Sequence, residues 1–495
     1  MTPRPEDAPH GDLPRGGLAS GRAPATSAMG HREALPWRAL AAPLLVAAAV
    51  RAALAIAFSA TEPLGDERAY LLLGERWWTE GTYEGIWAPG YPALIAALGG
   101  LLGDSTVSAL RGLQVLLGVW IVACTGALSM AIGGRRCGVL AAWIAALYLP
   151  LAGFSGLLYS ELLHLALFLP ALVLLSRWPG ASRRGALSHM AAAGLLLGLA
   201  ALVRESSALF IPILGAWVAL TGSRAGAPRA LPALTLLGCA AAVLLPWTLR
   251  NATFHGRLVP IAISTGGSAH IGLNAYDVNY DLAGLGEDPT QAPGALRATI
   301  RGAAPEAWAP TAEGPPADRA RGNVRQGIRF AVEHPLFFLR SRAVELVDLL
   351  SPLSYPVRSL RLASPGPPLG RPWARLVFAG LALAMVPTLL LLALRGWSRA
   401  AASPAHRGLL VWVCAGTLAS ALVNGLTRYR LPALPLLIAF AALGLVRTLA
   451  RTTTAQGAQE ERARRTRAAA AVSVCLVLLW IPSLEGVQQT LSALR

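Results

Sequence analysis

The chain has 495 residues, of which 54% are hydrophobic and only 14% charged, and its mean hydropathy is +0.51. Soluble proteins carry about 25% charged residues, so this composition argues strongly against a soluble enzyme. The net charge of +17 comes from 43 basic residues, all of them arginines, against 26 acidic residues. Because the arginines gather in short gaps between apolar runs, they indicate the cytoplasmic loops of a polytopic membrane protein and not a nucleic-acid partner.

Residues 1–35 are rich in Pro, Gly, Arg and Ala without a hydrophobic period, which predicts a disordered cytoplasmic tail. The apolar runs that follow predict an all-α polytopic membrane protein with about eleven transmembrane helices. With the tail inside the cell, the gaps at 134–137, 178–185, 223–229, 395–407 and 450–467 also fall inside, and each is rich in arginine. The runs lie near residues 39–60, 107–133, 138–155, 159–177, 186–203, 206–222, 230–249, 373–394, 408–424, 431–449 and 468–484.

Two long segments, 61–106 and 250–372, then fall on the outer side and are expected to form extracytoplasmic loops that carry amphipathic helices. The first contains an amphipathic stretch through Trp77 and Trp78, which suits a helix at the level of the lipid headgroups. It ends in a stiff turn at residues 88–92 that returns the chain to the bilayer. The second is expected to form a helix over about 321–342.

Charged residues at the outer ends of these runs are the candidates for chemistry, because ionisable groups at membrane depth are expensive to keep. The acids have a simpler explanation as helix-end markers, and the arginines as anchors to lipid headgroups. Arginine also offers a fork of donors that matches phosphate oxygens, so a lipid-linked phosphate is a natural partner. The acids are Asp66, Glu67 and Glu161, and the arginines are Arg204, Arg250, Arg428 and Arg430.

The cysteines and histidines lack the spacing of metal ligands. Five cysteines lie in or beside apolar runs without a C-x-x-C pair, which is typical of small buried hydrophobic residues. We therefore expect neither a metal nor a cofactor.

Several ordered motifs carry a resemblance to a known family. An acidic pair with Tyr70 follows the first run, and Pro89-Gly90-Tyr91-Pro92 and Tyr159-Ser160-Glu161 come next. The remaining motifs are Pro246-Trp247-Thr248-Leu249-Arg250-Asn251, residues 259–267 with Asn274 after them, His334-Pro335 and Arg428-Tyr429-Arg430-Leu431-Pro432. Over about residues 39–450, this order resembles the GT-C membrane glycosyltransferases that use a polyprenyl-phosphate sugar, the group that holds the protein O-mannosyltransferases and the lipid A aminoarabinose transferase.

The resemblance implies that Asp66 is the catalytic acid or base and that Glu161 is a second acid near the acceptor, with Glu67 beside them. It also implies that outer-face arginines hold the donor phosphate, and it extends the substrate-binding set to Tyr70, Tyr91 and Asn274. Relatives often carry a basic residue just before the Pro-Gly turn, where this chain has Trp87 and Ala88. Arg204, Arg250 or Arg428 is therefore expected to make the phosphate contact, with Arg250 and Arg428 first.

The expected function is transfer of a sugar from a polyprenyl-phosphate donor to a protein, lipid or polysaccharide acceptor, on the extracytoplasmic face of the cell membrane. The alternatives are a transporter or flippase of a lipid-linked or anionic substrate, and an oligosaccharide ligase or polymerase. Acids at the outer helix ends argue against a carrier, whose polar residues lie near the bilayer midplane. The expected parts are the tail at 1–35, a transmembrane catalytic module at 36–250, an extracytoplasmic subdomain at 251–372 and C-terminal transmembrane helices at 373–495.

Overall fold

The computed structural model describes residues 37–178, 182–221, 230–264, 314–362, 365–399, 403–421, 425–449 and 484–494, together with single residues between them. These residues form helices joined by turns and short irregular segments, and none of them lies in a strand. The expected tail at 1–35 lies outside the described residues, and so does almost all of the apolar run at 468–484.

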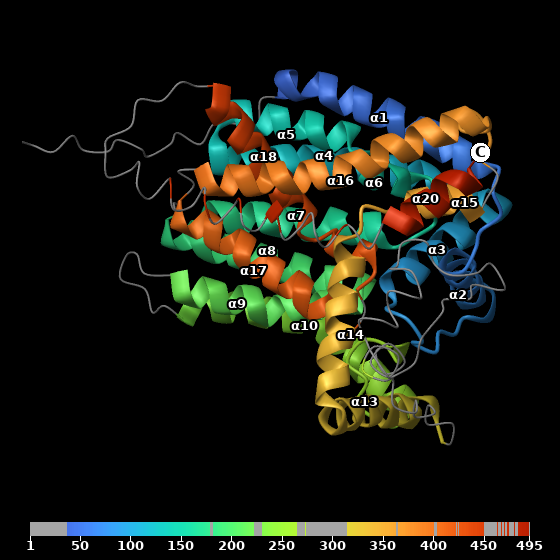
Figure 1. Ribbon diagram of the computed structural model, residues 1–495. Coiled ribbons are helices and arrows are strands. Elements are labelled where there is room, and N and C mark those ends of the chain that lie inside the picture. The colour runs from blue at the N-terminus through green and yellow to red at the C-terminus, as the bar shows by residue number, and fades with distance from the viewer. Residues whose placement is uncertain are drawn as a thin grey trace, which may run out of the picture. The chain divides into compact units, whose positions relative to one another are not determined.

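Each expected apolar run before residue 450 coincides with a helix or a pair of helices, and the long helices run side by side across the view of Figure 1. Glycine and proline mark most of the breaks between them, as their backbone preferences predict. The helices are α1 (Trp37–Ser59), α4 (Thr106–Gly133), α5 (Arg135–Leu147), α6 (Leu149–Ala152), α7 (Glu161–Arg177), α8 (Arg183–Val203), α9 (Phe210–Thr221), α10 (Ala230–His255), α16 (Pro372–Arg399), α17 (Pro404–Ala421) and α18 (Leu434–Leu449).

Fewer of these helices qualify as membrane spans than the sequence suggested. Among the described residues, five helical segments are long and apolar enough to cross a bilayer, or six if α5 and the bent segment after it form one span. At 1.5 Å per residue, the 12 residues of α9 and the 16 of α18 cover about 18 to 24 Å, less than the roughly 30 Å hydrocarbon core. The expected count of about eleven is therefore not confirmed, because an apolar run does not show where its helix breaks.

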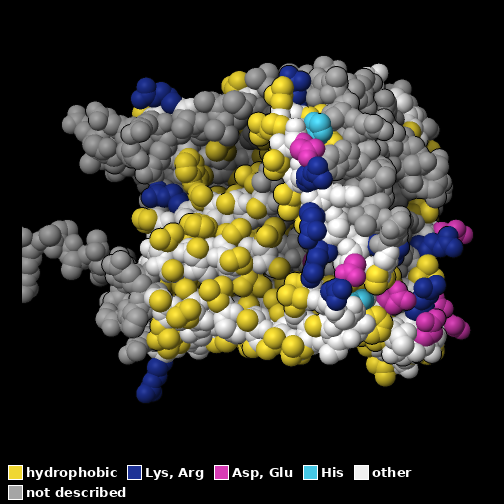
Figure 2. Space-filling view, turned by 90° about the horizontal axis from the view of Figure 1, so that it is seen from below, with side chains coloured by type: hydrophobic (Ala, Val, Ile, Leu, Met, Phe, Trp, Pro, Cys, Tyr) yellow, Lys and Arg dark blue, Asp and Glu magenta, His cyan; other side chains and the backbone are white. Residues whose placement is uncertain are grey.

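The outer surface of the long helices is apolar. In the most apolar 18-residue window of α10, only 17% of the residues are buried inside the protein. Figure 2 shows hydrophobic side chains spread over one face of the bundle, with a column of arginines along the edge of that face and most acidic side chains at or beyond the column. An exposed apolar belt of this extent needs lipid around it, so the fold is that of a membrane protein.

Two further helices, α2 (Asp66–Glu80) and α3 (Gly90–Leu102), lie at one end of the bundle in Figure 1. α2 is the amphipathic helix expected around the paired tryptophans. The Pro-Gly-Tyr-Pro turn begins α3, where proline is tolerated in the first helical turn. Buried Tyr91 and Ile95 of α3 pack against Leu110 of α4 and Leu158. The chain thus enters the bundle through α3, which begins within the turn that was expected to return it to the bilayer.

The helix expected over 321–342 is wrong in its extent, because the structure has two helices there. α13 (Pro316–Glu333) ends just before His334, and α14 (Pro335–Leu350) begins just after it. A residue before proline is disfavoured in the helical conformation, and His334 accordingly has φ −125° and ψ 57°. The proline thus separates two helices that a hydrophobic pattern alone would join. α15 (Tyr355–Leu362) and α20 (Leu484–Ala493) complete the described helices.

A buried arginine stabilises the break after α5. Arg51 of α1 donates from its two terminal nitrogens to the carbonyls of Ala145 and Ala146, both at 3.1 Å, and is fully buried. The last carbonyls of a helix lack intrahelical partners, so an arginine can satisfy them. The Arg51 side chain packs directly against the backbone of α4 at Gly118, where a side chain would not fit. A Cβ atom at Gly118 would lie 2.5 Å from Arg51 Cδ.

We expect Gly118→Ala to destabilise the protein by about 1 to 3 kcal/mol, because the added methyl group overpacks a side chain that two hydrogen bonds hold in place. Gly112→Ala is the matched control on the same helix, where a Cβ meets no atom within 4 Å. It should be neutral or stabilising by up to about 1 kcal/mol. Thermal unfolding of both variants in detergent measures the difference, and equal melting temperatures would contradict this account of Arg51.

Candidate active site

The ends of helices α2, α7 and α8 meet a short 3-10 helix where α2 and α3 lie. Asp66 and Glu161 stand in the first turns of α2 and α7, and Arg204 follows the last turn of α8. Arg428 belongs to the 3-10 helix, Thr427–Arg430, which precedes α18. Acids are favoured at helix N-termini and bases at C-termini, so the helix ends favour the charges of Asp66, Glu161 and Arg204, while Arg428 is stabilised by the two acids it contacts.

The four side chains form a continuous chain of alternating charge. Arg428 Nη1 lies 2.6 Å from Asp66 Oδ2 and 3.8 Å from Glu161 Oε1, and Arg204 Nη1 lies 2.7 Å from the same Glu161 oxygen. The exposed fraction of the side chain is 32% for Asp66, 12% for each arginine and 2% for Glu161. The charges cancel within the cluster, which is how buried ions avoid the cost of an unpaired charge.

Tyrosine rings surround the guanidinium of Arg428. Its Cζ lies 5.1 Å from the ring centroid of Tyr355, 5.7 Å from that of Tyr159 and 5.9 Å from that of Tyr429. The Tyr429 ring also lies 5.4 Å from Arg204 Cζ. Aromatic faces attract cations, so these rings hold the two arginines in place and limit their access to water.

Tyr70 connects α2 to the same cluster. Its hydroxyl lies 3.1 Å from Ser160 Oγ, which also accepts a hydrogen bond from Arg204 Nη1 at 3.3 Å. The Tyr70 ring packs edge-on against Trp87 and Tyr91. Burial raises the pKa of Tyr70 above its ordinary range, so the residue stays a neutral donor. Tyr91, also expected in the site, packs edge-on against Tyr70, and its buried hydroxyl has no hydrogen-bond partner among the described residues.

Glu67 is bound by the backbone, and among the described residues it forms no ion pair with Arg204 or Arg428. The amide of Leu158 donates to its Oε1 at 2.7 Å, and the amide of Leu64 donates to Oε2 at 3.3 Å. Burial raises the pKa of Glu67, against the opposing effect of these two amides. Its carboxylate therefore fastens α2 to the segment before α7, while its neighbour Asp66 faces Arg428.

Arg250 and Arg430 make contacts outside the charged cluster. Arg250 donates to the Tyr83 carbonyl and, at 3.1 Å, to Asn251 Oδ1, and its guanidinium lies on the rings of Trp247 and Phe254. Arg430 donates to the carbonyls of Leu349 and Ser351.

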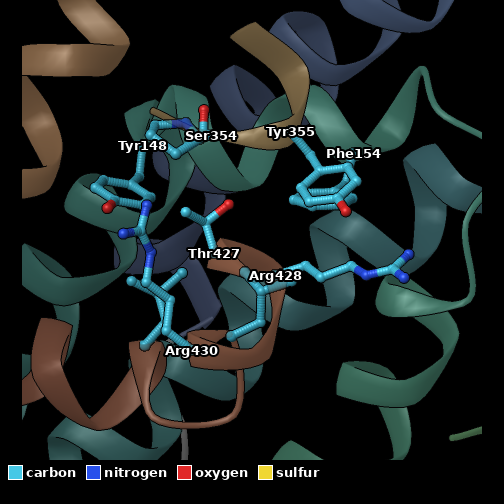
Figure 3. A pocket seen from close by; sticks show the side chains of 10 residues that line it. Tyr148, Phe154, Ser354, Tyr355, Thr427, Arg428 and Arg430 are labelled. Carbon is cyan, nitrogen blue, oxygen red and sulfur yellow. The ribbon is translucent and has the colours of Figure 1, made fainter. Parts of the chain in front are cut away.

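Figure 3 shows the side chains of Arg428 and Arg430 lying apart, with Arg430 beside Tyr148 and Arg428 running past the Phe154 and Tyr355 rings. Of the four expected arginines, two join the acids. Asn274 lies outside the described residues.

Arg428 also lines a small cavity. Glu161, Arg204 and Arg428 line it together with His164, Ser206, Phe210, Ser420, Tyr429, Leu431 and Pro432. Among the residues that the structure describes, Glu161 Oε2 is buried without a hydrogen-bond partner, and so is Arg428 Nε. Buried polar atoms usually have partners, so an acceptor for Arg428 and a donor for Glu161 are both missing from the cluster.

The sequence predicted Tyr70 and Tyr91 but not the other residues that surround the charged cluster, which are Tyr159, Ser160, Tyr355 and Tyr429. Tyr159, Ser160 and Tyr429 stood inside the quoted motifs, next to residues that were singled out, and adjacency was the only available signal. Tyr355 belongs to α15, nearly 200 residues from Glu161 in the chain, so no local pattern connected it with the site.

No family model and no curated protein matches the sequence. Among solved structures, the oligosaccharyltransferase AglB from Archaeoglobus fulgidus, in complex with an inhibitory peptide and a dolichol-phosphate, is similar with 15% identity and a TM-score of 0.42, over 91% of this chain and 56% of that one. ArnT from Cupriavidus metallidurans, bound to undecaprenyl phosphate, is similar with 14% identity and a TM-score of 0.38, over 83% of this chain and 79% of that one. The chain thus spans little more than half the length of the archaeal enzyme. These scores mark a distant likeness, and the function proposed below rests on the site.

We expect Glu67→Gln to lower the stability of the protein by about 1 to 3 kcal/mol. The two carboxylate oxygens each accept from a backbone amide, and a glutamine side chain must present its NH₂ group to one of these donors, leaving that amide unpaired. Glu75→Gln on the exposed side of α2 removes the same charge and serves as the control. Thermal unfolding in detergent compares the two, and an unchanged melting temperature for Glu67→Gln would contradict a fastening role.

Proposed function

We propose that the protein is a membrane glycosyltransferase that moves a sugar from a polyprenyl-phosphate donor to an acceptor hydroxyl on the extracytoplasmic face of the membrane. The observation that carries this proposal is the chain of two acids and two arginines at one end of an apolar helical bundle. Its charges suit a reaction in which one group loses a proton and another leaves as a phosphate.

The two arginines suit the leaving group. A lipid phosphate bound to a sugar is a diester with one negative charge, and it gains a second charge as the bond to the anomeric carbon breaks. Arg428 offers a fork of donors to the phosphate oxygens, and Arg204, held near it by Glu161, supplies a second positive charge for the developing one. The aromatic rings around Arg428 exclude water, which strengthens this stabilisation.

Asp66 suits the role of general base. It is the most exposed of the four charged groups and stands at the start of α2, on the rim of the cluster. As the acceptor oxygen attacks the anomeric carbon, its proton passes to the Asp66 carboxylate, and the electron pair of the breaking bond leaves with the phosphate oxygen. Glu161 is too buried to contact an acceptor directly, and its carboxylate holds the two arginines next to each other.

Asp66→Asn should reduce sugar transfer by about 10²- to 10⁴-fold, because the substitution keeps the shape of the side chain and removes its basicity. Membranes that contain the variant are incubated with a radiolabelled polyprenyl-phosphate sugar, and label in the acceptor is counted. Glu75→Gln, the same loss of charge on an exposed face of α2, should transfer normally. Near-normal turnover by Asp66→Asn would exclude Asp66 as the base, and uptake of intact label into vesicles would favour a transporter.

Arg428→Ala should raise the donor KM by roughly one to two decades, since a hydrogen bond to a charged group contributes about 1.5 to 3 kcal/mol. Arg204→Ala should lower kcat more than it raises KM, because its charge acts mainly on the developing phosphate dianion. Arg76→Ala on the exposed side of α2 is the control. A loss confined to Arg250→Ala would move the phosphate site to the loop around Tyr83.

A further inference from the structure

The contact between Arg428 and Asp66 uses only part of each group. Arg428 reaches both acids through the same nitrogen, Nη1, while its Nε is buried and has no hydrogen-bond partner in the described part of the chain. Asp66 contacts the arginine through Oδ2 alone. A guanidinium binds an anion best when two of its N–H groups point at two oxygens of one ligand. The ion pair in the structure is therefore weaker than the pair that Arg428 can form.

A phosphate offers Arg428 a second acceptor oxygen, which the present contact with Asp66 does not supply. Two non-bridging oxygens match two donors of the Arg428 fork, whereas the Asp66 carboxylate engages one. Such a phosphate would take the place of Asp66 on Arg428, because Asp66 is 32% exposed whereas Glu161, the other acid on this arginine, is 2% exposed. Phosphate and Asp66 are thus competitors for one cation.

Asp66 is free to leave without any movement of its helix. Its only ion pair among the described residues is the one with Arg428, and about a third of its side chain is exposed. α2 stays in place because Glu67 is bound to two backbone amides and Tyr70 is packed between Trp87 and Tyr91. Rotation of one side chain is enough to open the contact.

We propose that the phosphate of a lipid-linked donor displaces Asp66 from Arg428, and that the released carboxylate is then the base for the acceptor. This inference rests on the proposed function and adds an order to it. Before the donor arrives, one of the two carboxylate oxygens of Asp66 lies 2.6 Å from Arg428 Nη1, which fixes the direction of the side chain. Arg428 thereby positions the base, and an acceptor that enters first meets a carboxylate that is already engaged.

Competition predicts that Asp66→Asn binds the lipid phosphate more tightly although it no longer transfers sugar. The probe is a polyprenyl phosphate without a sugar, titrated into the purified full-length protein so that binding is separated from turnover. An exposed ion pair contributes up to about 1 kcal/mol, so its loss should tighten binding by about threefold to fivefold. Glu75→Gln removes the same charge elsewhere on α2 and should bind like the wild type, while Arg428→Ala should weaken binding tenfold or more.

A second measurement separates displacement from a general change in charge. Carbodiimide labelling of carboxylates, read by mass spectrometry of the Asp66 peptide, should increase when polyprenyl phosphate is added, with Glu75 as the internal standard. A ligand that merely covered Asp66 would decrease the labelling. Decreased or unchanged labelling overturns the displacement, and the assignment of the base then stands on the transfer assay alone.

The outcomes distinguish this inference from the function on which it rests. Unchanged or weaker binding by Asp66→Asn, with weaker binding by Arg428→Ala, overturns the competition and leaves the donor site intact. Equal binding by Arg428→Ala and wild type overturns the donor site itself. Inorganic phosphate is titrated in parallel, and a response to it without a response to polyprenyl phosphate also overturns the inference, because the competing anion would not be lipid-linked.

Discussion

The contact on which the site depends is the one that Arg428 makes with two acids from different helices. Asp66 comes from the start of α2 and Glu161 from the start of α7, and Arg204 closes the series from the end of α8. Glu161 and the two arginines are the members most costly to remove, since losing one of them leaves a mostly buried charge uncompensated. The same charges therefore hold the three helix ends and the 3-10 helix together.

Irregular backbone around the cluster gives these charges their positions. α5 breaks before Pro150, the segment from 153 to 160 turns back into α7, and a short 3-10 helix carries Arg428. Non-helical backbone at membrane depth is tolerated only where protein buries it and satisfies its polar groups. Arg51 at the end of α5, Glu67 at the amide of Leu158 and Arg430 at two carbonyls around the end of α14 each meet that requirement. Two of the charged residues expected in the site, Glu67 and Arg430, thus bind the backbone instead.

The difference between charged residues that bind the backbone and those that join the cluster explains what the sequence predicted and what it did not. Each apolar run takes the chain to the other side of the membrane. Counting the runs was therefore enough to predict that Asp66, Glu161, Arg204 and Arg428 share one end of the bundle. Distinguishing Arg428 from Arg430, or Asp66 from Glu67, requires the direction of individual side chains, and neighbours in a helix differ by about 100°. Tyr355 joins the site through packing between segments far apart in the chain, for which a single sequence holds no signal.

The balance of charges within the cluster also affects how a mostly buried site can bind an anionic substrate. Two arginines and two carboxylates sum to zero, and the cluster is mostly buried, so adding a lone phosphate would leave an excess negative charge where charges are costly. Exchanging Asp66 for a phosphate diester keeps the sum at zero, because one negative charge enters as another moves outward to water. The free energy of binding then comes from the better geometry of the phosphate on Arg428 and from its lipid tail, with no net charge to desolvate. In the proposed reaction the second charge on the phosphate appears only when the sugar leaves, as Asp66 takes up the acceptor proton and loses its own negative charge at the rim of the cluster.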